Sequence, residues 1–186
     1  RGVRANESLT IIRRLLEGES VTFSGSEFDI SDARIKPKPR EPIPVLVGGR
    51  SDAALERAAK HSEGWIGVWC SAKRYAEALG ILTEKAEEFG RNQVDWSHGY
   101  QPWVGIDKED PQKARAAVAK GMEDFYKIPF SKFERYTPFG TPSEVAEQLF
   151  PYIEAGCRLF NLKVCASKPE EEMGLGAEVL ALLRKN

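Results

Sequence analysis

Short apolar runs that alternate with helical patterns are the feature that most constrains what this chain can fold into. Four such runs, over residues 43–47, 64–69, 99–106 and 158–164, are each followed by residues with helical periodicity or helix caps. Strands that alternate with helices make β-α units, and successive units give a parallel sheet with right-handed crossovers. Four strands could form a small open sheet or half of a closed barrel, and the pattern alone does not separate these two folds.

Helix boundaries are marked by periodicity and by capping residues. Leucine and isoleucine at helical spacing predict a helix over residues 7–17. Asp110 and Thr141 each stand before a proline, and Thr141 also forms the capping-box pattern with Glu144. Further helices are predicted over residues 51–61, 71–90 and 170–184.

The remaining segments are predicted to be a hairpin, an extended stretch and a loop. Residues 21–30 contain two strand-forming pieces on either side of Ser24-Gly25-Ser26, which favours a hairpin. Prolines keep residues 36–42 extended, and aromatic residues with prolines and serines predict a loop over residues 127–139. No low-complexity linker divides the chain, so residues 1–186 are expected to form one domain.

Composition and charge exclude several classes of protein. The 186 residues carry 27 basic and 28 acidic side chains, and this balance excludes a general nucleic-acid binder. No apolar stretch is long enough to span a bilayer, and no signal-peptide pattern is present. The three cysteines lack the spacing of a disulfide framework, so reduced thiols in a cytoplasmic protein are expected. The chain begins at Arg1 and opens directly into a helical pattern, which suggests a fragment of a longer protein.

The two histidines do not indicate a metal site. His61 ends a predicted helix, where a cationic side chain interacts favourably with the helix dipole. His98 precedes a strand in a polar stretch and is expected to be exposed. Neither has a cysteine or carboxylate at ligand spacing, so no metal is expected.

The best local candidate for a binding site is the turn Gly48-Gly49-Arg50-Ser51, which follows the first of the four apolar runs. Glycines there let the backbone turn tightly, and the positive end of the next helix favours a phosphate. Arg50 could add a bidentate, charge-assisted contact. The structural alternative is a plain strand-to-helix turn in which Ser51 caps the helix, and Asp52 would repel an anion if it pointed inward. Because the match is no full phosphate-loop signature, residue chemistry alone slightly favours the structural alternative.

Residues just after the other apolar runs would share one face if the strands formed a barrel. Trp69 could stack on a planar ring, and Lys168 could contact a phosphate. Each candidate also has a structural interpretation as a strand end, a helix cap or a solvated side chain. The remaining candidates at these strand ends are Cys70, Ser71, Asp107, Lys108, Cys165 and Ser167.

Five segments, in one order along the chain, resemble the luciferase-like oxidoreductases. Glu63 stands where that family usually has an aspartate. One such segment would be weak, but five in register cover nearly the whole chain, which is therefore identified as a member of this superfamily by resemblance. The segments are Arg1-Gly2 with Glu7-Ser8-Leu9, Val21–Gly25, Lys36–Pro39 with Pro42–Gly49, Ser51–Trp65, and Phe139–Ala146 with Glu154-Ala155-Gly156.

The resemblance implies a (β/α)₈ TIM barrel of which residues 1–186 supply the C-terminal half, about four β-α units of a single luciferase-like domain. It implies an oxidoreductase or monooxygenase acting on a small organic substrate. The cofactor would be reduced FMN with dioxygen, or coenzyme F420 in hydride transfer, and the choice is near even.

In such proteins the turn after the fifth strand helps to hold the cofactor's phosphate. That role maps onto Gly48, Gly49, Arg50 and Ser51 and reverses the preference for the structural alternative. The acid and base residues come from the first half of the barrel, so no catalytic residue is named in this chain. A homodimer is expected.

Two other interpretations remain open. The first is a catalytically incomplete fragment that acts only as a binding or oligomerising module, because half a barrel would expose sheet edges that invite pairing with another chain. The second is a flavodoxin-like open sheet, whose phosphate loop would also follow the first strand of the β-α series. Only the family resemblance separates the barrel from this open sheet.

Overall fold

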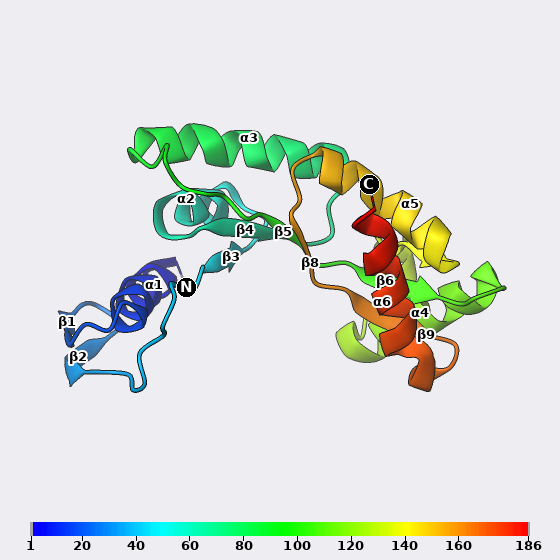
Figure 1. Cartoon of the computed structure of the whole chain (residues 1–186), viewed down its shortest axis with the longest axis horizontal. Helices are drawn as coiled ribbons and strands as arrows, with labels where there is room; N and C mark the ends of the chain where they lie inside the picture. Colours follow the sequence, from blue (N-terminus) through cyan, green and yellow to red (C-terminus); the bar gives the residue numbers. More distant parts are fainter. Residues whose placement is uncertain (1, 186) are drawn as a thin grey trace. The chain divides into compact units, whose positions relative to one another are not determined.

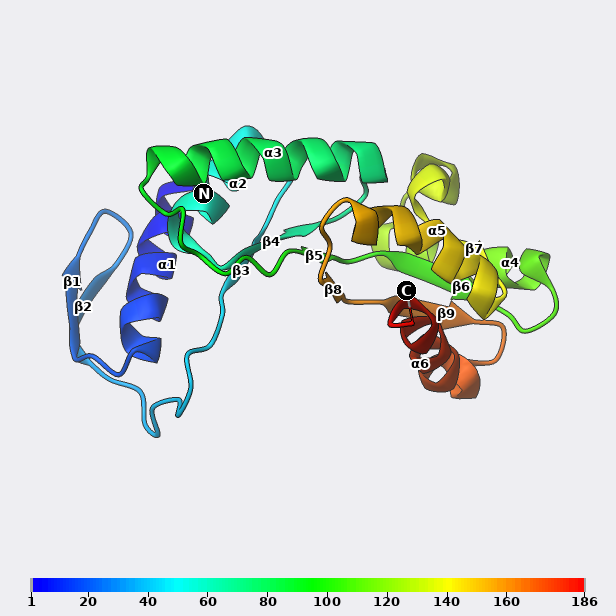
Figure 2. The same ribbon diagram turned by 45° about the horizontal axis from the view of Figure 1, so that its top comes forward.

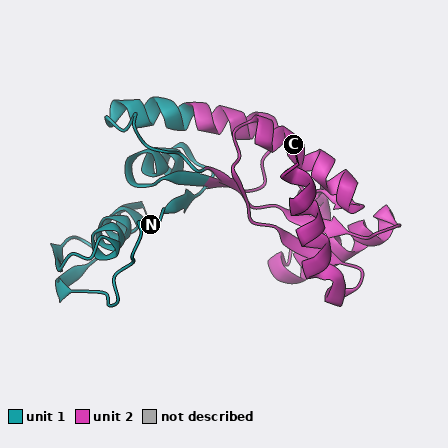
Figure 3. Ribbon diagram, viewed as in Figure 1, with its two compact units in different colours: residues 1–65, 81–97 teal, residues 66–80, 98–186 magenta. Residues whose placement is uncertain are grey.

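The computed structural model describes residues 2–185 and shows an α/β architecture (Figure 1). Arg1, which is part of the first resembling segment, lies outside the described residues. The chain divides into two compact units, residues 1–65 with 81–97 and residues 66–80 with 98–186 (Figure 3). No helix within residues 2–185 is long and apolar enough to cross a membrane.

The first unit opens with a helix and a hairpin. Helix α1 (Gly2–Leu16) begins earlier than the periodicity predicts. Strands β1 (Val21–Ser24) and β2 (Asp29–Ala33) pair antiparallel, with Phe23 opposite Ile30, so the predicted hairpin is confirmed.

The carboxylate of Glu7, on α1, holds the turn of this hairpin. One oxygen accepts the backbone N–H and the hydroxyl of Ser26, each at 2.9 Å. The other oxygen accepts the backbone N–H groups of Glu27 at 3.0 Å and Phe28 at 3.1 Å. These N–H groups have no partner in the hairpin ladder, so the acid satisfies donors that would otherwise depend on water.

The rest of the first unit carries the predicted strand-to-helix turn. Strand β3 (Leu46–Gly48) leads into helix α2 (Asp52–His61), and β3 neighbours β4 (Gly64–Gly67) in its sheet. Helix α2 buries an alanine-rich face and packs against α1. Helix α3 (Ala72–Glu88) and strand β4 each contribute residues to both units.

The second unit is built on parallel strands. The predicted strand over 99–106 forms as β5 (Gly99–Tyr100) and β6 (Trp103–Ile106), with Pro102, which has no N–H to donate, between them. The predicted strand over 158–164 likewise forms as β8 (Leu159–Phe160) and β9 (Lys163–Ala166). Strand β5 pairs in parallel with β4 and β8, and β6 pairs in parallel with β9.

One strand of this unit was not predicted. Strand β7 (Phe139–Gly140) pairs in parallel with β6, in the order β7-β6-β9. It ends the segment that was expected to be a loop, which also contains two 3₁₀ turns, Phe130–Lys132 and Glu134–Tyr136. The loop prediction for residues 127–139 is therefore wrong at its C-terminal end, because a two-residue strand has too few residues to show a period.

Helices cover both faces of the β7-β6-β9 sheet (Figures 1 and 2). A Cβ atom placed on Gly121, in α4 (Pro111–Tyr126), would lie 2.8 Å from Sγ of Cys165. A Cβ atom placed on Gly176, in α6 (Glu172–Leu183), would lie 2.9 Å from a methyl carbon of Val164. Successive β9 residues point to opposite faces, so α4 and α6 lie on opposite sides of the sheet. Helix α5 (Pro142–Glu154) packs against α6.

The capping residues of this unit are where the sequence predicts them. The Asp110 carboxylate accepts the backbone N–H groups of Gln112 and Lys113 at the start of α4. Thr141 and Glu144 form a complete capping box at the start of α5. These local hydrogen bonds satisfy N–H groups that have no partner inside the helix.

Candidate functional site

The predicted phosphate turn, Gly48 to Ser51, follows the carboxyl end of β3. Gly49 has φ 137°, a conformation that a side chain resists, and a Cβ there would lie 2.5 Å from Cβ of Ala54. The carbonyl oxygen of Gly49 accepts the indole N–H of the buried Trp65 at 2.8 Å. Glycine is therefore required at position 49, and Trp65 holds the turn in place.

The turn ends at the N-terminus of α2. Ser51 is the N-cap residue, and its carbonyl oxygen accepts the backbone N–H groups of Ala54 at 2.8 Å and Leu55 at 3.1 Å. Its hydroxyl makes no capping hydrogen bond, so the part of the structural alternative in which the Ser51 side chain caps the helix is wrong, although Ser51 does occupy the N-cap position. The Ser51 side chain thus leaves the positive end of the α2 dipole uncapped, which suits an anion, whereas Asp52 places a carboxylate in the same turn.

Arg50 stands between the glycines and the helix. It is exposed and makes no hydrogen bond or ion pair with any residue that the structure describes. Gly48 and Ser51 are also exposed, whereas Gly49 is half-buried. The four predicted residues therefore form one continuous, accessible turn, with a guanidinium group that is available to a ligand.

Glu63 braces the strand that carries this turn. One carboxylate oxygen accepts the backbone N–H of Val45 at 2.9 Å, and the other pairs with Arg13 at 2.6 Å. Arg91 lies 3.6 Å from that second oxygen. The two backbones also pair, since Glu63 donates its N–H to the carbonyl oxygen of Val45 at 2.9 Å. The structure thus gives Glu63, the departure from the family's usual aspartate, a role in support of β3.

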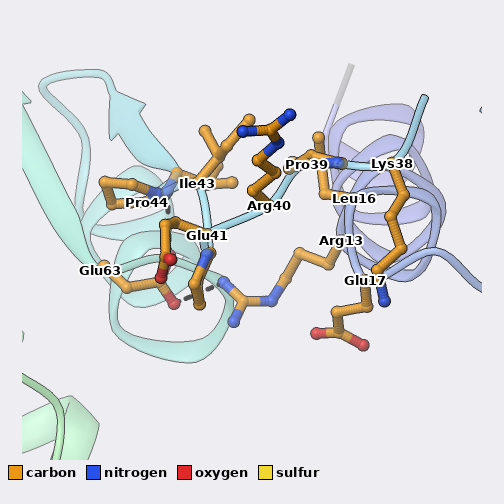
Figure 4. Close-up of a pocket in the computed structure, with 12 residues that line it drawn as sticks. Arg13, Leu16, Glu17, Lys38, Pro39, Arg40, Glu41, Ile43, Pro44 and Glu63 are labelled. Atoms are coloured by element: carbon orange, nitrogen blue, oxygen red, sulfur yellow. Dashed lines mark hydrogen bonds and ion pairs between the residues drawn. The ribbon is translucent and has the colours of Figure 1, made fainter. Parts of the chain in front are cut away.

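A cavity of about 450 Å³ lies at the opposite end of β3 (Figure 4). Arg13 reaches across it from α1 toward Glu63, and Pro39, Pro42 and Pro44 form part of its wall. Val45, which lines this cavity, precedes β3, whereas Gly48 ends it. The cavity is therefore separate from the Gly48–Ser51 turn, and no candidate residue of the sequence lines it.

In the second unit, the carboxyl ends of β6 and β9 come together. The hydroxyl of Ser167 donates a hydrogen bond to Asp107, which also accepts the backbone N–H groups of Glu109 at 3.1 Å and Asp110 at 3.0 Å. These hydrogen bonds, with that of Ser167 the strongest, lower the pKa of Asp107 to about 2. Asp107 is therefore a firmly ionised carboxylate that organises the turn after β6.

The two lysines among the candidate residues also lie at these strand ends. Lys108 and Lys168 lie 3.5 Å and 3.6 Å from the carboxylate of Glu171. Both lysine side chains are largely exposed, so the pairs contribute little to stability. The thiol of Cys165 is half-buried, and burial raises its pKa to about 11, which leaves it protonated and unreactive at neutral pH.

The turn after β4 contains Trp69, Cys70 and Ser71. The hydroxyl of Ser71 accepts the backbone N–H of Arg74 at 3.2 Å, so its predicted capping role is confirmed. Cys70 is buried, and its carbonyl oxygen accepts hydrogen bonds from the phenols of Tyr100 at 3.1 Å and Tyr152 at 2.6 Å. Trp69 is half-exposed and has φ 48°, in the left-handed region.

The histidines are structural. His61 ends α2 as expected, and burial, followed by the charge of Lys60, lowers its pKa. His98 was expected to be exposed, but it is buried, and burial lowers its pKa to about 4. Its backbone carbonyl accepts the N–H groups of Arg158 and Leu159, at the start of β8. Within residues 2–185, no three His, Cys, Asp or Glu side chains are grouped so that they could hold a metal ion.

Comparison with known proteins identifies the family. The chain belongs to the luciferase-like monooxygenase family, whose sequence model matches residues 1–137. The F420-dependent glucose-6-phosphate dehydrogenase of Nakamurella multipartita is 35% identical over 207 aligned positions, which cover 99% of this chain and 61% of that protein. This chain thus spans about three fifths of the length of that relative.

Solved structures show the same fold. An F420-dependent secondary alcohol dehydrogenase, in complex with an F420-acetone adduct, superposes with a TM-score of 0.81 at 18% identity. That match covers 96% of this chain and 60% of the other. The monooxygenase RslO1 from Streptomyces bottropensis superposes with a TM-score of 0.73 at 22% identity, covering 96% of this chain and 61% of the other. The α/β fold of this chain therefore matches that of luciferase-like TIM-barrel enzymes.

Proposed function

We propose that the complete protein is an oxidoreductase that uses a flavin-type cofactor, with coenzyme F420 favoured over FMN, and that Gly48, Gly49, Arg50 and Ser51 bind the cofactor's phosphate. The observation that carries this proposal is the turn itself. In four consecutive residues it combines an obligatory glycine, a helix N-cap whose hydroxyl makes no capping hydrogen bond, and an arginine with no hydrogen bond or ion pair within residues 2–185. Backbone N–H groups, a helix dipole and a guanidinium are the donors that a phosphate prefers.

We also propose that the chain supplies the C-terminal half of a (β/α)₈ barrel, as one portion of a single domain. Its parallel strands, and its match to about three fifths of larger barrel enzymes, support this view. In such barrels the site lies at the carboxyl ends of the strands, which is where the Gly48–Ser51 turn follows β3.

The choice of F420 rests on the relatives. The curated relative from Nakamurella multipartita is named for F420, and so is the solved structure with the higher TM-score of the two, whereas RslO1 is named as a monooxygenase. When bound, the cofactor would exchange a hydride with a small organic substrate. The residues of this chain would hold its phosphate and thereby fix the position of its ring, while the acid and base residues are expected in the other half of the barrel.

The test is a binding titration of the protein with F420 and with FMN, followed by fluorescence. We expect binding of F420, and a loss of about tenfold or more in affinity for Arg50→Gln, since a charge-assisted contact contributes roughly 1.5–3 kcal/mol. Arg40→Gln is the matched control, because Arg40 is an exposed arginine that lines the other cavity. Absence of binding for both cofactors would overturn the proposal, and tighter binding of FMN would reverse the choice of cofactor.

The alternative, a module that binds or oligomerises without turnover, keeps one supporting observation. Strand β9 is an edge of the β7-β6-β9 sheet, and an open edge invites pairing with another strand. The expected homodimer is also a proposal, and sedimentation of the full chain tests both. A compact monomer that binds F420 would exclude the module, whereas a dimer without cofactor binding would favour it. The cytoplasmic location stays a prediction.

A further inference from the structure

We propose that Trp69 forms a fixed aromatic wall of the substrate site, and that the substrate presents a neutral, planar, apolar group to it. This inference rests on the proposed function and adds to it the chemical class of the substrate. Trp69 follows the carboxyl end of β4, and in barrels of this kind the residues after each strand face the reaction site.

The backbone of Trp69 is held in a conformation that a bulky residue avoids. Its φ of 48° is in the left-handed region, which non-glycine residues seldom adopt unless the surroundings impose it, and such residues cluster at functional sites. The next residue is fixed in place, because the carbonyl oxygen of Cys70 accepts two phenol hydrogen bonds, from Tyr100 and Tyr152. Those two rings stack at 4.1 Å with an interplanar angle of 13°, which fixes both donors.

The indole of Trp69 is held as firmly as its backbone. Its ring lies 5.0 Å from that of Tyr126, edge to face, and 5.0 Å from that of Phe133, tilted by 44°. Tyr126 is itself fixed, since its hydroxyl accepts the indole N–H of Trp103 at 3.1 Å. Trp69 nevertheless remains half-exposed. A large ring is therefore packed between two others while the residue stays partly exposed, so a ligand that stacks on it need not order the side chain first.

The surroundings of this ring favour a neutral ligand. Two of the rings packed against Trp69 are those of Tyr126 and Phe133, and Trp69 lies against an apolar cluster. Two cations that contact this cluster already have partners. Arg115 pairs with Glu134 at 2.6 Å and lies over the ring of Phe130. Lys163 lies over the ring of Trp103, 5.2 Å from its centre. These two cations are therefore not free to meet a phosphate, whereas a planar apolar group can stack on the indole.

The test compares two probes on the full chain by ligand-observed NMR: indole, which is neutral and planar, and glucose 6-phosphate, which is charged. We expect indole to bind and glucose 6-phosphate to leave the Trp69 region unaffected. Trp69→Ala should weaken indole binding about fivefold or more, while Trp69→Phe, which keeps an aromatic face, stays within about threefold. Tyr152→Phe removes one of the two hydrogen bonds to the Cys70 carbonyl oxygen. It should weaken indole binding by a smaller factor than Trp69→Ala does.

Trp96→Phe serves as the control, since Trp96 belongs to the other compact unit. F420 titration of each variant separates the two proposals. Equal indole binding by the wild type and by both Trp69 variants would overturn the aromatic wall, and so would tighter binding of glucose 6-phosphate that depends on Trp69. Failure of F420 to bind the wild type would instead overturn the cofactor proposal. Retained F420 binding by Trp69→Ala, with loss of indole binding, would support both.

Discussion

The carboxylate of Glu63 pairs with Nη1 of Arg13 at 2.6 Å while its second oxygen accepts the backbone N–H of Val45 at 2.9 Å. Arg13 donates from the same nitrogen to the carbonyl oxygen of His61 at 3.0 Å. Helix α1, the end of α2 and the approach to β3 therefore meet at one side chain. The strand that carries the proposed phosphate turn is thus anchored from its opposite end.

Glu63→Gln tests this anchor. The substitution keeps the size of the side chain but removes its charge, so the half-buried Arg13 and Arg91 lose their shared partner. We expect the free energy of unfolding to fall by about 1–2 kcal/mol, measured by urea denaturation. Glu63→Asp, which restores the family's usual residue, should lose part of this stability, since the shorter chain cannot reach both partners.

Glu88→Gln is the matched control for Glu63→Gln. It breaks the exposed ion pair with Lys85, at 2.9 Å, and should leave the free energy of unfolding nearly unchanged, because solvent screens such pairs. Equal effects for the two glutamines would show that Glu63 acts as an ordinary surface charge.

Gly49→Ala should disrupt the proposed phosphate turn. The new methyl group would overlap that of Ala54, and alanine does not tolerate φ 137°. We expect a loss of about 1–3 kcal/mol in stability and a loss of F420 affinity. Gly80→Ala is the control, because Gly80 lies in α3 with open space around it, and there alanine should stabilise the helix by about 0.5–1 kcal/mol.

Thr141→Ala and Ser51→Ala should differ although both residues are helix N-caps. The hydroxyl of Thr141 accepts the backbone N–H of Glu144, so its removal should cost about 1 kcal/mol in thermal or urea unfolding. The hydroxyl of Ser51 caps nothing, and its removal should cost less than about 0.5 kcal/mol. A large cost at Ser51 would contradict the view that its hydroxyl is available to a ligand.

Stability should fall in mild acid because of His98. Burial lowers its pKa to about 4 in the folded state, below the usual 6.5, so the unfolded chain takes up a proton first as the pH falls. The contribution is fully present above about pH 6.5 and is lost between that pH and about 4. We expect a loss on the order of 2 kcal/mol between pH 7 and pH 5.

The measurement is the pH dependence of urea unfolding for the wild type and for His98→Gln, which cannot titrate in this range. The variant should show a distinctly flatter profile. His61→Gln is the comparison variant. The pKa of His61 is also lowered, so this substitution should change the pH profile in the same direction. An unchanged slope in His98→Gln would contradict the burial of His98.

The order of strands and helices could be predicted from the sequence because each is encoded locally. The capping box of Thr141 and Glu144 closes within four residues, and Gly49 marks a turn by its own conformational freedom. Strand β7 could not be found in this way, because two residues become a strand only by pairing with β6. His98 was misjudged for the same reason, since its burial arises only in the folded chain, where its backbone pairs with the distant start of β8.

The proposed site divides in the same way into local and distant features. The Gly48–Ser51 turn is contiguous, so its residues could be named from the sequence. The hydrogen bond from Tyr152 to Cys70 joins residues 82 positions apart, and nothing local in either segment marks it. That Trp69 is a fixed aromatic surface could therefore be inferred only from the folded structure.

Positions 7 and 25 should vary together among relatives of this protein. A Cβ on Gly25 would lie 2.5 Å from a carboxylate oxygen of Glu7, the same group that holds the hairpin turn. A larger residue at 25 would thus expel the acid from its place. A smaller residue at 7 would remove one of the two obstacles to a side chain there, the other being the ring of Phe23 at 2.6 Å. An aligned set of homologues should therefore show these two changes in the same sequences, as a coupled pair on the first helix and hairpin.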